Sequence, residues 1–184
     1  MGDDVNKQTY RHYFIEQRKA MDKATHNMFN TLLMEGLRNV LSEYPVKKIA
    51  VFNPILNEVD VRGLKDSYEI YYPKIMNGEL QFVKDTGEFT KGMLGVMEPS
   101  GDVSVEKSTL DAIIVPGLAY DLGLYRLGYG KGFYDRYLKD YKGLKVGVTL
   151  ELFMVEALPN KAHDIPVDIL VTDTMVYENE YNEL

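Results

Sequence analysis

Residues 111–117 read DAIIVPG, an apolar run that a proline and a glycine close. Such a run is typical of a buried strand, Asp111–Val115, that leads into a turn. Strands that are apolar throughout belong in a parallel or mixed sheet with both faces covered. The pattern therefore predicts an α/β fold with three layers, a mostly parallel (mixed) sheet and helices on both faces. The other expected strands are Lys48–Asn53, Glu69–Tyr72, Lys145–Thr149 and Asp168–Thr172.

Two long helices are expected before the first strand. Lys7–Met21 reads as a helix with a polar, basic side. A second helix begins near Asp22 or Thr25, either of which is a good N-cap residue, and Pro45 stops it. Its apolar positions recur at helical spacing and are Met28, Leu32, Leu33, Leu37 and Val40.

The middle of the chain is expected to hold fewer regular elements. Pro73 is expected to end the strand before it, because proline lacks the N–H that a sheet needs. Gly78–Gly101 contains five glycines and one proline, and we expect loops with one or two short strands there, in the most mobile part of the molecule. Further helices are expected at Val61–Ser67 and Gly132–Asp140.

Composition excludes several classes of protein. The chain has 184 residues, of which 45% are hydrophobic and 27% charged, which is typical of a single globular domain over residues 1–184. No apolar run reaches the roughly 20 residues of a membrane span, and the start is too polar for a secretory signal, so we expect a cytoplasmic protein. Because it contains no cysteine, disulfides, thiolate metal sites and thiol nucleophiles are excluded. With three histidines, any metal is expected to be a hard cation on oxygen ligands.

The distribution of charge points to one segment. A net charge of -7 argues against a nucleic-acid partner. Between residues 126 and 139, however, four cations stand against one anion, so this segment carries +3. A local inversion of this kind in an acidic chain indicates a site for an anionic ligand.

The segment begins with RLGYGKGFYD, residues 126–135. Three glycines at alternate positions let the backbone approach a ligand closely, and a helix N-terminus follows, which suits phosphate. The loop is neither a P-loop, since Gly132 follows Lys131, nor a dinucleotide fingerprint, since its third glycine comes one residue early. The alternative is a glycine-rich turn that only connects a strand to a helix. With its cations included, the loop Arg126–Tyr134 predicts binding of a nucleoside triphosphate that is used on an anionic small molecule.

The longer stretch resembles a known family. Val115–Asp121 followed by Arg126–Leu138 is similar to the signature of the 5-formyltetrahydrofolate cyclo-ligase (methenyltetrahydrofolate synthetase) family, VPGLAFD and then RLGxGxGYYD. Tyr120 replaces the usual Phe, and Phe133 the first Tyr. The family normally has Gly two residues before the Arg, where this chain has Leu124.

Weaker matches follow in the same order as in the family. Residues 7–11 resemble its K-x-x-L-R element, residues 57–60 its N-x-E-V-D element and residues 95–99 its G-x-x-E-P element. The pair His163-Asp164 and the segment Val167–Asp173 resemble its closing H-D and V-D…V-T elements. The resemblance therefore extends along most of the chain.

The resemblance implies a reaction and its cofactors. The family converts 5-formyltetrahydrofolate to 5,10-methenyltetrahydrofolate with ATP and Mg²⁺. Phosphorylation of the formyl oxygen makes it a leaving group, N10 attacks, and ADP and phosphate are released. The implied partners are therefore a reduced folate and ATP, with no nucleic acid and no membrane, and a monomer is expected.

The resemblance also implies a role for individual residues. The catalytic residues are expected to be Arg126, Lys131 and Tyr134. Substrate binding is expected from Asn53, Glu58, Tyr129 and Phe133, metal binding from Asp135 and Asp164, and contact with the folate tail from Lys74. The residues expected to bind ATP are Lys7, Gln8, Thr9, Tyr10 and Arg11, and Arg126, Leu127, Gly128, Tyr129, Gly130, Lys131, Gly132, Phe133 and Tyr134.

Simpler interpretations stand beside these roles. Lys7 and Arg11 lie at i and i+4 of a helix and fit a solvated basic face equally well. Asp135 is also a favourable residue in the first turn of any helix, and Asp164 fits an ordinary loop. The aromatic side chains fit packing in the core. At the level of function, the alternatives are an enzyme related to sugar-phosphate isomerases or CoA-transferases and a non-catalytic nucleotide or folate binding module.

Overall fold

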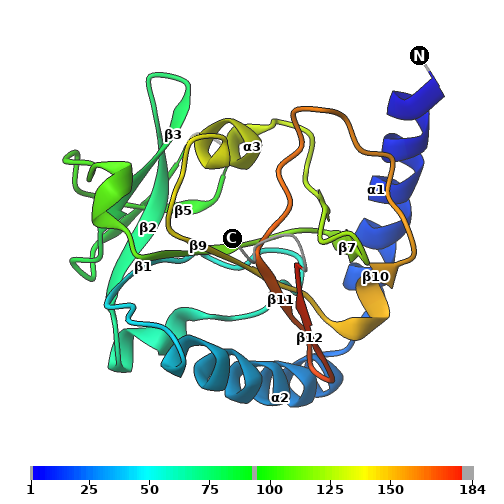
Figure 1. Ribbon diagram of the computed structural model, residues 1–184, viewed down its shortest axis with the longest axis horizontal. Helices are drawn as coiled ribbons and strands as arrows, with labels where there is room; N and C mark the ends of the chain where they lie inside the picture. The colour runs from blue at the N-terminus through cyan, green and yellow to red at the C-terminus, as the bar shows by residue number, and fades with distance from the viewer. Residues whose placement is uncertain (1, 93–94, 180–184) are drawn as a thin grey trace.

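The computed structural model describes residues 2–92 and 95–179, with side chains from residue 7 on. Its centre is a seven-stranded sheet in the order β12-β11-β9-β6-β1-β2-β3 (Figure 1). The five strands from β11 to β2 are parallel, and β12 and β3 pair antiparallel at the two edges. The strands are β1 Lys48–Ala50, β2 Glu69–Met76, β3 Glu79–Lys84, β6 Ala112–Val115, β9 Leu144–Val148, β11 Ile169–Val171 and β12 Val176–Glu178.

The two faces of this sheet carry separate apolar cores. Along β6, Ala112 and Ile114 belong to one buried cluster, whereas Ile113 and Val115 belong to the other. The first cluster contains the buried side of α2 (Lys23–Ser42), and the second contains residues of α3 (Phe133–Leu138). Figure 1 shows these helices on opposite sides of the sheet. The predicted three-layer α/β fold with a mostly parallel sheet is thereby confirmed.

Two helices precede the sheet in the chain. Helix α1 covers Gly2–Ala20, and α2 starts after the N-cap Asp22, whose Oδ1 accepts a hydrogen bond of 2.9 Å from Thr25 N. This confirms one of the two expected start sites. Figure 1 shows α1 standing at one end of the molecule, near β7 and β10.

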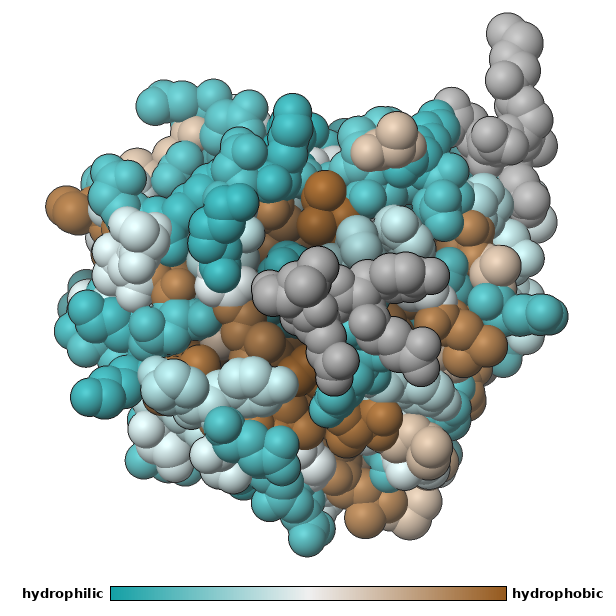
Figure 2. All heavy atoms as spheres, viewed as in Figure 1, coloured by the Kyte–Doolittle hydropathy of each residue, from teal (hydrophilic) through white to brown (hydrophobic). Residues whose placement is uncertain are grey.

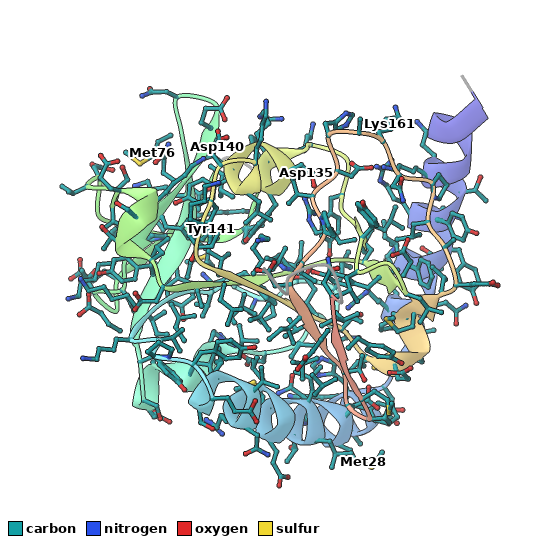
Figure 3. All side chains as sticks on the ribbon, viewed as in Figure 1. Met28, Met76, Asp135, Asp140, Tyr141 and Lys161 are labelled. Atoms are coloured by element: carbon teal, nitrogen blue, oxygen red, sulfur yellow. The ribbon has the colours of Figure 1, made fainter. Side chains whose placement is uncertain are left out.

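The buried stripe of α2 differs from the prediction. Leu33 and Leu37 are buried as expected, but Met28 and Leu32 are exposed by 56% and 48%. Toward the N-terminus the buried stripe continues from Leu33 to Phe29, which packs against the core. Met28 and Leu32 each precede a residue of the stripe by one position, so they lie about 100° round the helix from the stripe. Figure 2 shows polar side chains over much of the visible face and apolar ones at the lower right, where Figure 3 labels Met28.

Pro73 does not end β2, which runs on to Met76. Strand β1 pairs with β2 only as far as Tyr71, so β3 is the neighbour that supplies the ladder beyond that point. A proline is tolerated where one side of a strand has no ladder partner.

The middle of the chain is more regular than expected. Instead of one or two strands, Gly78–Gly101 holds β3, β4 (Phe89–Lys91) and β5 (Met97–Pro99), the last two paired as a hairpin. The expected helix at Val61–Ser67 is a 3₁₀ turn, η1 (Arg62–Asp66). Two more 3₁₀ turns are η2 (Lys107–Thr109) and η3 (Glu151–Phe153).

A small second sheet was not predicted. It has the order β10-β7-β8, with β7 at Ala119–Asp121, β8 at Arg126–Leu127 and β10 at Met154–Val155. These strands have two or three residues, too few to show a period of two. Because β8 leads directly into the glycine-rich loop, this sheet fixes where the loop starts. In the described part of the chain, no helix is long and apolar enough to cross a bilayer.

Candidate active site

A cavity of about 530 Å³ opens at the carboxyl ends of the parallel strands, where ligands usually bind in open α/β sheets. It is lined by residues that follow β1 and β6, by the turn from β8 to α3, and by the side of α1. The remaining walls come from β2, from the β4–β5 hairpin and from residues 161–164 before β11. Segments that are distant in the sequence therefore meet around one hollow.

The glycine-rich loop forms one wall, and each glycine has a reason to be there. Gly130 and Gly132 have φ values of 98° and 66°, which L side chains rarely adopt. At Gly128 a Cβ atom would lie 2.6 Å from the guanidinium of Arg126, and at Gly130 it would lie 3.4 Å from that of Arg11. The absence of side chains thus allows two arginines to lie against the loop backbone.

Helix α1 brings two of its cations to this wall. Lys7 Nζ lies 2.6 Å from Asp164 Oδ2, and Arg11 Nε donates a hydrogen bond of 2.9 Å to Gly128 O. Both side chains line the cavity, whereas Gln8, Thr9 and Tyr10 between them do not. Tyr10 instead packs on the core beside Phe14, as expected for positions on other sides of the helix.

Arg126 lies at the foot of the loop, where its side chain is 6% exposed. Its Nη2 is 2.9 Å from Asp135 Oδ2, and its guanidinium lies 5.4 Å from the centre of the Tyr134 ring. Arg126 Nε and the Tyr134 hydroxyl are buried without a hydrogen-bond partner among the described residues. Because buried polar groups usually have a partner, these two groups are available to hydrogen-bond a ligand in the cavity. Lys131 also lines the cavity, and its side chain is exposed.

Glu58 is the buried acid of the cavity, with 4% of its surface exposed. Its carboxylate accepts hydrogen bonds of 3.0 Å from Tyr129 hydroxyl and 3.0 Å from Ile55 N. Burial raises the pKa of Glu58 to about 7, although the Ile55 N–H, the charge of Arg18 and the Tyr129 hydroxyl all act to lower it. A buried carboxylate with spare acceptor sites and a pKa near neutrality is typical of a functional group.

The other expected substrate contacts also line the cavity. Asn53 follows β1, and its Nδ2 donates to Met97 O over 2.8 Å. Phe133 opens α3, and Lys74 Nζ donates to Gly101 O and Asp102 Oδ1 over 2.9 and 2.7 Å. The structure thus brings all these predicted side chains together.

Two acidic side chains of the cavity are suited to a hard cation. Asp135 and Asp164 both line it, and each pairs with a cation, Arg126 and Lys7 respectively. Burial acts to raise the pKa of Asp164, but the hydrogen bonds from Lys7 and Lys161 N lower it below its usual value. Within residues 2–92 and 95–179, no three histidine or acidic side chains form a ready-made metal cluster. Two carboxylates nevertheless fit Mg²⁺, which usually takes one or two from the protein and the rest of its ligands from phosphates and water.

Two residues of the site were missed by sequence reasoning. Arg18 is 1% exposed and lies on α1 at i+4 from the buried Phe14, so an arginine within the apolar stripe was the signal. Glu98 is 9% exposed and lines the cavity from β5. It belongs to the segment that resembles G-x-x-E-P, to which no role was assigned.

Comparison with known proteins is consistent across sequence and structure. Residues 4–173 match the model of the 5-formyltetrahydrofolate cyclo-ligase family. A 5-formyltetrahydrofolate cyclo-ligase of Escherichia coli (strain K12) is 34% identical over 145 residues, which cover 71% of this chain and 80% of the relative. The corresponding protein of Mycoplasma pneumoniae is 25% identical over 92% of this chain and 99% of its own.

Solved structures show the same likeness. The 5,10-methenyltetrahydrofolate synthetase of Aquifex aeolicus superposes with a TM-score of 0.85 at 34% identity, covering 97% of this chain and 95% of that one. The Mycoplasma pneumoniae synthetase gives a TM-score of 0.77 at 25% identity, covering 91% and 99%.

Proposed function

This chain belongs to the 5-formyltetrahydrofolate cyclo-ligase family and is an enzyme of that type, and we propose that its cavity uses ATP and Mg²⁺ to close 5-formyltetrahydrofolate to 5,10-methenyltetrahydrofolate. The observation that carries the proposal is the meeting, in one cavity, of a cationic glycine-rich loop with the buried acceptor Glu58. The first suits a triphosphate, and the second suits the N–H groups of an amino-pyrimidine ring.

The loop and α1 form the nucleotide site. Backbone N–H groups near Gly130 and Gly132 would donate to phosphate oxygens, and Arg126, Lys131 and Lys7, which line the same cavity, would add full positive charges. The unpartnered Arg126 Nε is a donor available to a phosphate oxygen. Asp135 and Asp164 would hold Mg²⁺, which neutralises phosphate charge when it is bound.

Glu58 orients the folate. A carboxylate accepts two parallel N–H bonds from the amino-pyrimidine edge of the pterin, and Asn53 offers a further polar contact. Tyr129 and Phe133 line the cavity from the glycine-rich loop and provide aromatic surface for the ring. The formyl group is thereby presented to the loop.

The reaction requires activation of a poor leaving group. Transfer of the terminal phosphoryl group of ATP to the formyl oxygen gives ADP and a good leaving group. N10 then forms a bond to the formyl carbon and loses its proton to the departing phosphate, as the carbon–oxygen bond breaks. Arg126 and Lys131 stabilise the charge on the transferring phosphoryl group, and the Tyr134 hydroxyl, which has no partner among the described residues, is a donor available to the same group.

The direct test is a turnover assay. The protein is mixed with 5-formyltetrahydrofolate, Mg²⁺ and ATP, and the near-ultraviolet absorbance of the methenyl product is followed. We expect a rise that depends on ATP and on Mg²⁺. No rise with ATP present would exclude the enzyme, and ATP binding without turnover would favour a binding module.

A further inference from the structure

A buried arginine beside the cavity takes no part in the proposed chemistry. The side chain of Arg18 donates to the main-chain carbonyls of Leu118, Gly117 and Asn57 over 2.9 to 3.1 Å. Its guanidinium also lies 4.2 Å from the centre of the Phe153 ring. Among the described residues, no carboxylate forms an ion pair with it. Its buried charge is therefore compensated by main-chain carbonyls and by the electrostatic attraction of Glu58, and not by a salt bridge.

The contact with Asn57 is reciprocal. Arg18 Nη1 donates to Asn57 O over 3.1 Å, and Asn57 Nδ2 donates back to Arg18 O over 2.7 Å and to Met21 O over 3.2 Å. Asn57 and Leu56 both have positive φ values, 53° and 48°. Leucine rarely adopts this conformation, so the contact with α1 holds a strained turn. The next residue in the chain is Glu58.

We propose that Arg18 is a positioning residue for Glu58, which fixes the turn that aims the carboxylate and supplies a positive charge behind it. The proposal rests on the proposed function, in which ionised Glu58 accepts N–H groups of the substrate. Arg18 itself does not line the cavity, so it acts through Glu58 and not on the folate.

The groups that face Glu58 allow the effect of this charge to be isolated. Arg18 approaches from α1 and the Tyr129 hydroxyl from the glycine-rich loop, and both act to lower the pKa of Glu58. Burial, together with the charge of Glu58, raises the pKa of Tyr134. From α2, His26 Nε2 lies 3.0 Å from the main-chain oxygen of Glu58. Burial lowers the pKa of Arg18, and the carboxylate of Glu58 acts to raise it, so each charge supports the other. Loss of the Arg18 charge should therefore raise the pKa of Glu58 further above about 7.

The test is the affinity for 5-formyltetrahydrofolate as a function of pH, measured by calorimetry between pH 6 and pH 9. Wild-type affinity should rise with pH through a midpoint near the Glu58 pKa of about 7. In Arg18→Gln and Arg18→Met the midpoint should move upward by about one unit, so that binding at pH 7 is roughly fivefold weaker and recovers toward pH 9. Arg18→Lys retains the charge and should keep the wild-type midpoint.

Two controls separate this proposal from its alternatives. In Glu58→Gln the affinity for folate should no longer depend on pH. The double variant Glu58→Gln with Arg18→Gln should also show no pH dependence. Asn57→Gly keeps the positive φ but removes the side-chain clamp, so it should weaken binding severalfold without moving the midpoint. If Arg18→Gln and Arg18→Met bind with the wild-type midpoint, or if neither unfolds cooperatively on heating, Arg18 only holds the fold and the proposal is overturned. If Glu58→Gln binds folate as tightly as wild type at pH 8, it is the proposed function of Glu58 that fails.

Discussion

The site contains two charged clusters that are built differently. In the ion-pair cluster, each cation is held by a carboxylate side chain, Lys7 by Asp164 and Arg126 by Asp135. In the Glu58 cluster, Arg18 is held by main-chain carbonyls, and Glu58 accepts one main-chain and one Tyr129 hydrogen bond. The two arginines differ in exposure as well, since Arg18 is buried as a whole residue and Arg126 is only partly buried.

The difference indicates which charges are exchanged during binding and which stay in place. A cation paired with a side chain can pass to a phosphate while its carboxylate passes to a metal ion, so that each charged group keeps a partner of opposite charge. A cation bound to main-chain carbonyls cannot leave without exposing buried acceptors, which costs roughly 1–3 kcal/mol for each. We therefore expect the ion-pair cluster to rearrange around its ligand and the Glu58 cluster to remain fixed.

The largest effect is expected when a cation of the loop is removed. Arg126→Ala should lower kcat/KM for ATP about 1000-fold, or about 4 kcal/mol, because it removes charge stabilisation of the transferring phosphoryl group. Lys131→Ala should act in the same direction. Folate affinity should change less than threefold in both, as measured by calorimetry. Lys139→Ala, an exposed cation at the end of α3, is the matched control. Equal losses for both ligands would contradict a division between the two clusters.

A second effect concerns the cost of keeping Glu58 ionised. Its pKa is about 7 in the folded protein and near 4.5 in the unfolded chain, so the folded state holds a proton that the unfolded state has lost between these values. Stability should therefore fall as pH rises from 4.5 to 7 and stay low above pH 7. Glu58→Gln removes this fall. The change that it makes to the free energy of unfolding should therefore be about 3 kcal/mol more favourable at pH 8 than at pH 4.5. Urea denaturation at both pH values measures it.

Exposed Glu156→Gln serves as the control for that measurement and should show no such difference between the two pH values. A Glu58→Gln protein that is less stable than wild type at pH 8 would show that the carboxylate stabilises the fold. The Glu58 cluster would then be a structural feature and not one kept for binding.

A third effect concerns the ion-pair cluster, where one substitution should change the affinity for ATP in opposite directions with and without Mg²⁺. Asp164→Asn removes the carboxylate that competes with phosphate for Lys7, so metal-free ATP should bind about tenfold more tightly, or by about 1.4 kcal/mol. The same change removes a ligand for Mg²⁺, so the magnesium complex of ATP should bind about tenfold more weakly. Asp135→Asn should have the same two effects, because Asp135 is the carboxylate paired with Arg126. Calorimetry with and without Mg²⁺ measures both.

Asp140→Asn is the control, because Asp140 follows α3, where Figure 3 labels it, and is not one of the residues that line the cavity. If affinity for the two forms of ATP moves in the same direction in Asp164→Asn, the ion pairs do not exchange with the ligand.

The sequence predicted the large sheet because buried parallel strands are apolar throughout, as in Asp111–Val115. It also placed the loop Arg126–Tyr134 beside Lys7 and Glu58, although only through the resemblance to a family, since no periodicity brings residues so distant together. The short strands β7 and β8 were missed because two or three residues carry no repeating pattern.

Arg18 was missed for a different physical reason. Its partners are backbone carbonyls, and carbonyls are identical at every position of a sequence. The pairs of Lys7 with Asp164 and Arg126 with Asp135 join residues that were each predicted, but for ligands and not for one another. Sequence therefore indicates which charged residues line the cavity. It does not indicate as readily which of them form ion pairs when no ligand is bound.

The smallest effect concerns the turn that sets Arg126. Leu124 has a φ of 62°, at the position where the family normally has Gly, and the residue is 3% exposed. Alanine in the left-handed region costs about 1 kcal/mol more than glycine, so Leu124→Gly should be more stable than Leu124→Ala by about that amount. At Leu110, equally buried with a φ of -88°, the order should reverse, because glycine is the more flexible residue in the unfolded chain. Urea unfolding of the four variants decides it. If alanine is more stable than glycine at both sites, the turn at Leu124 relaxes to accept a side chain. The turn before Arg126 would then be less rigid than the turn before Glu58.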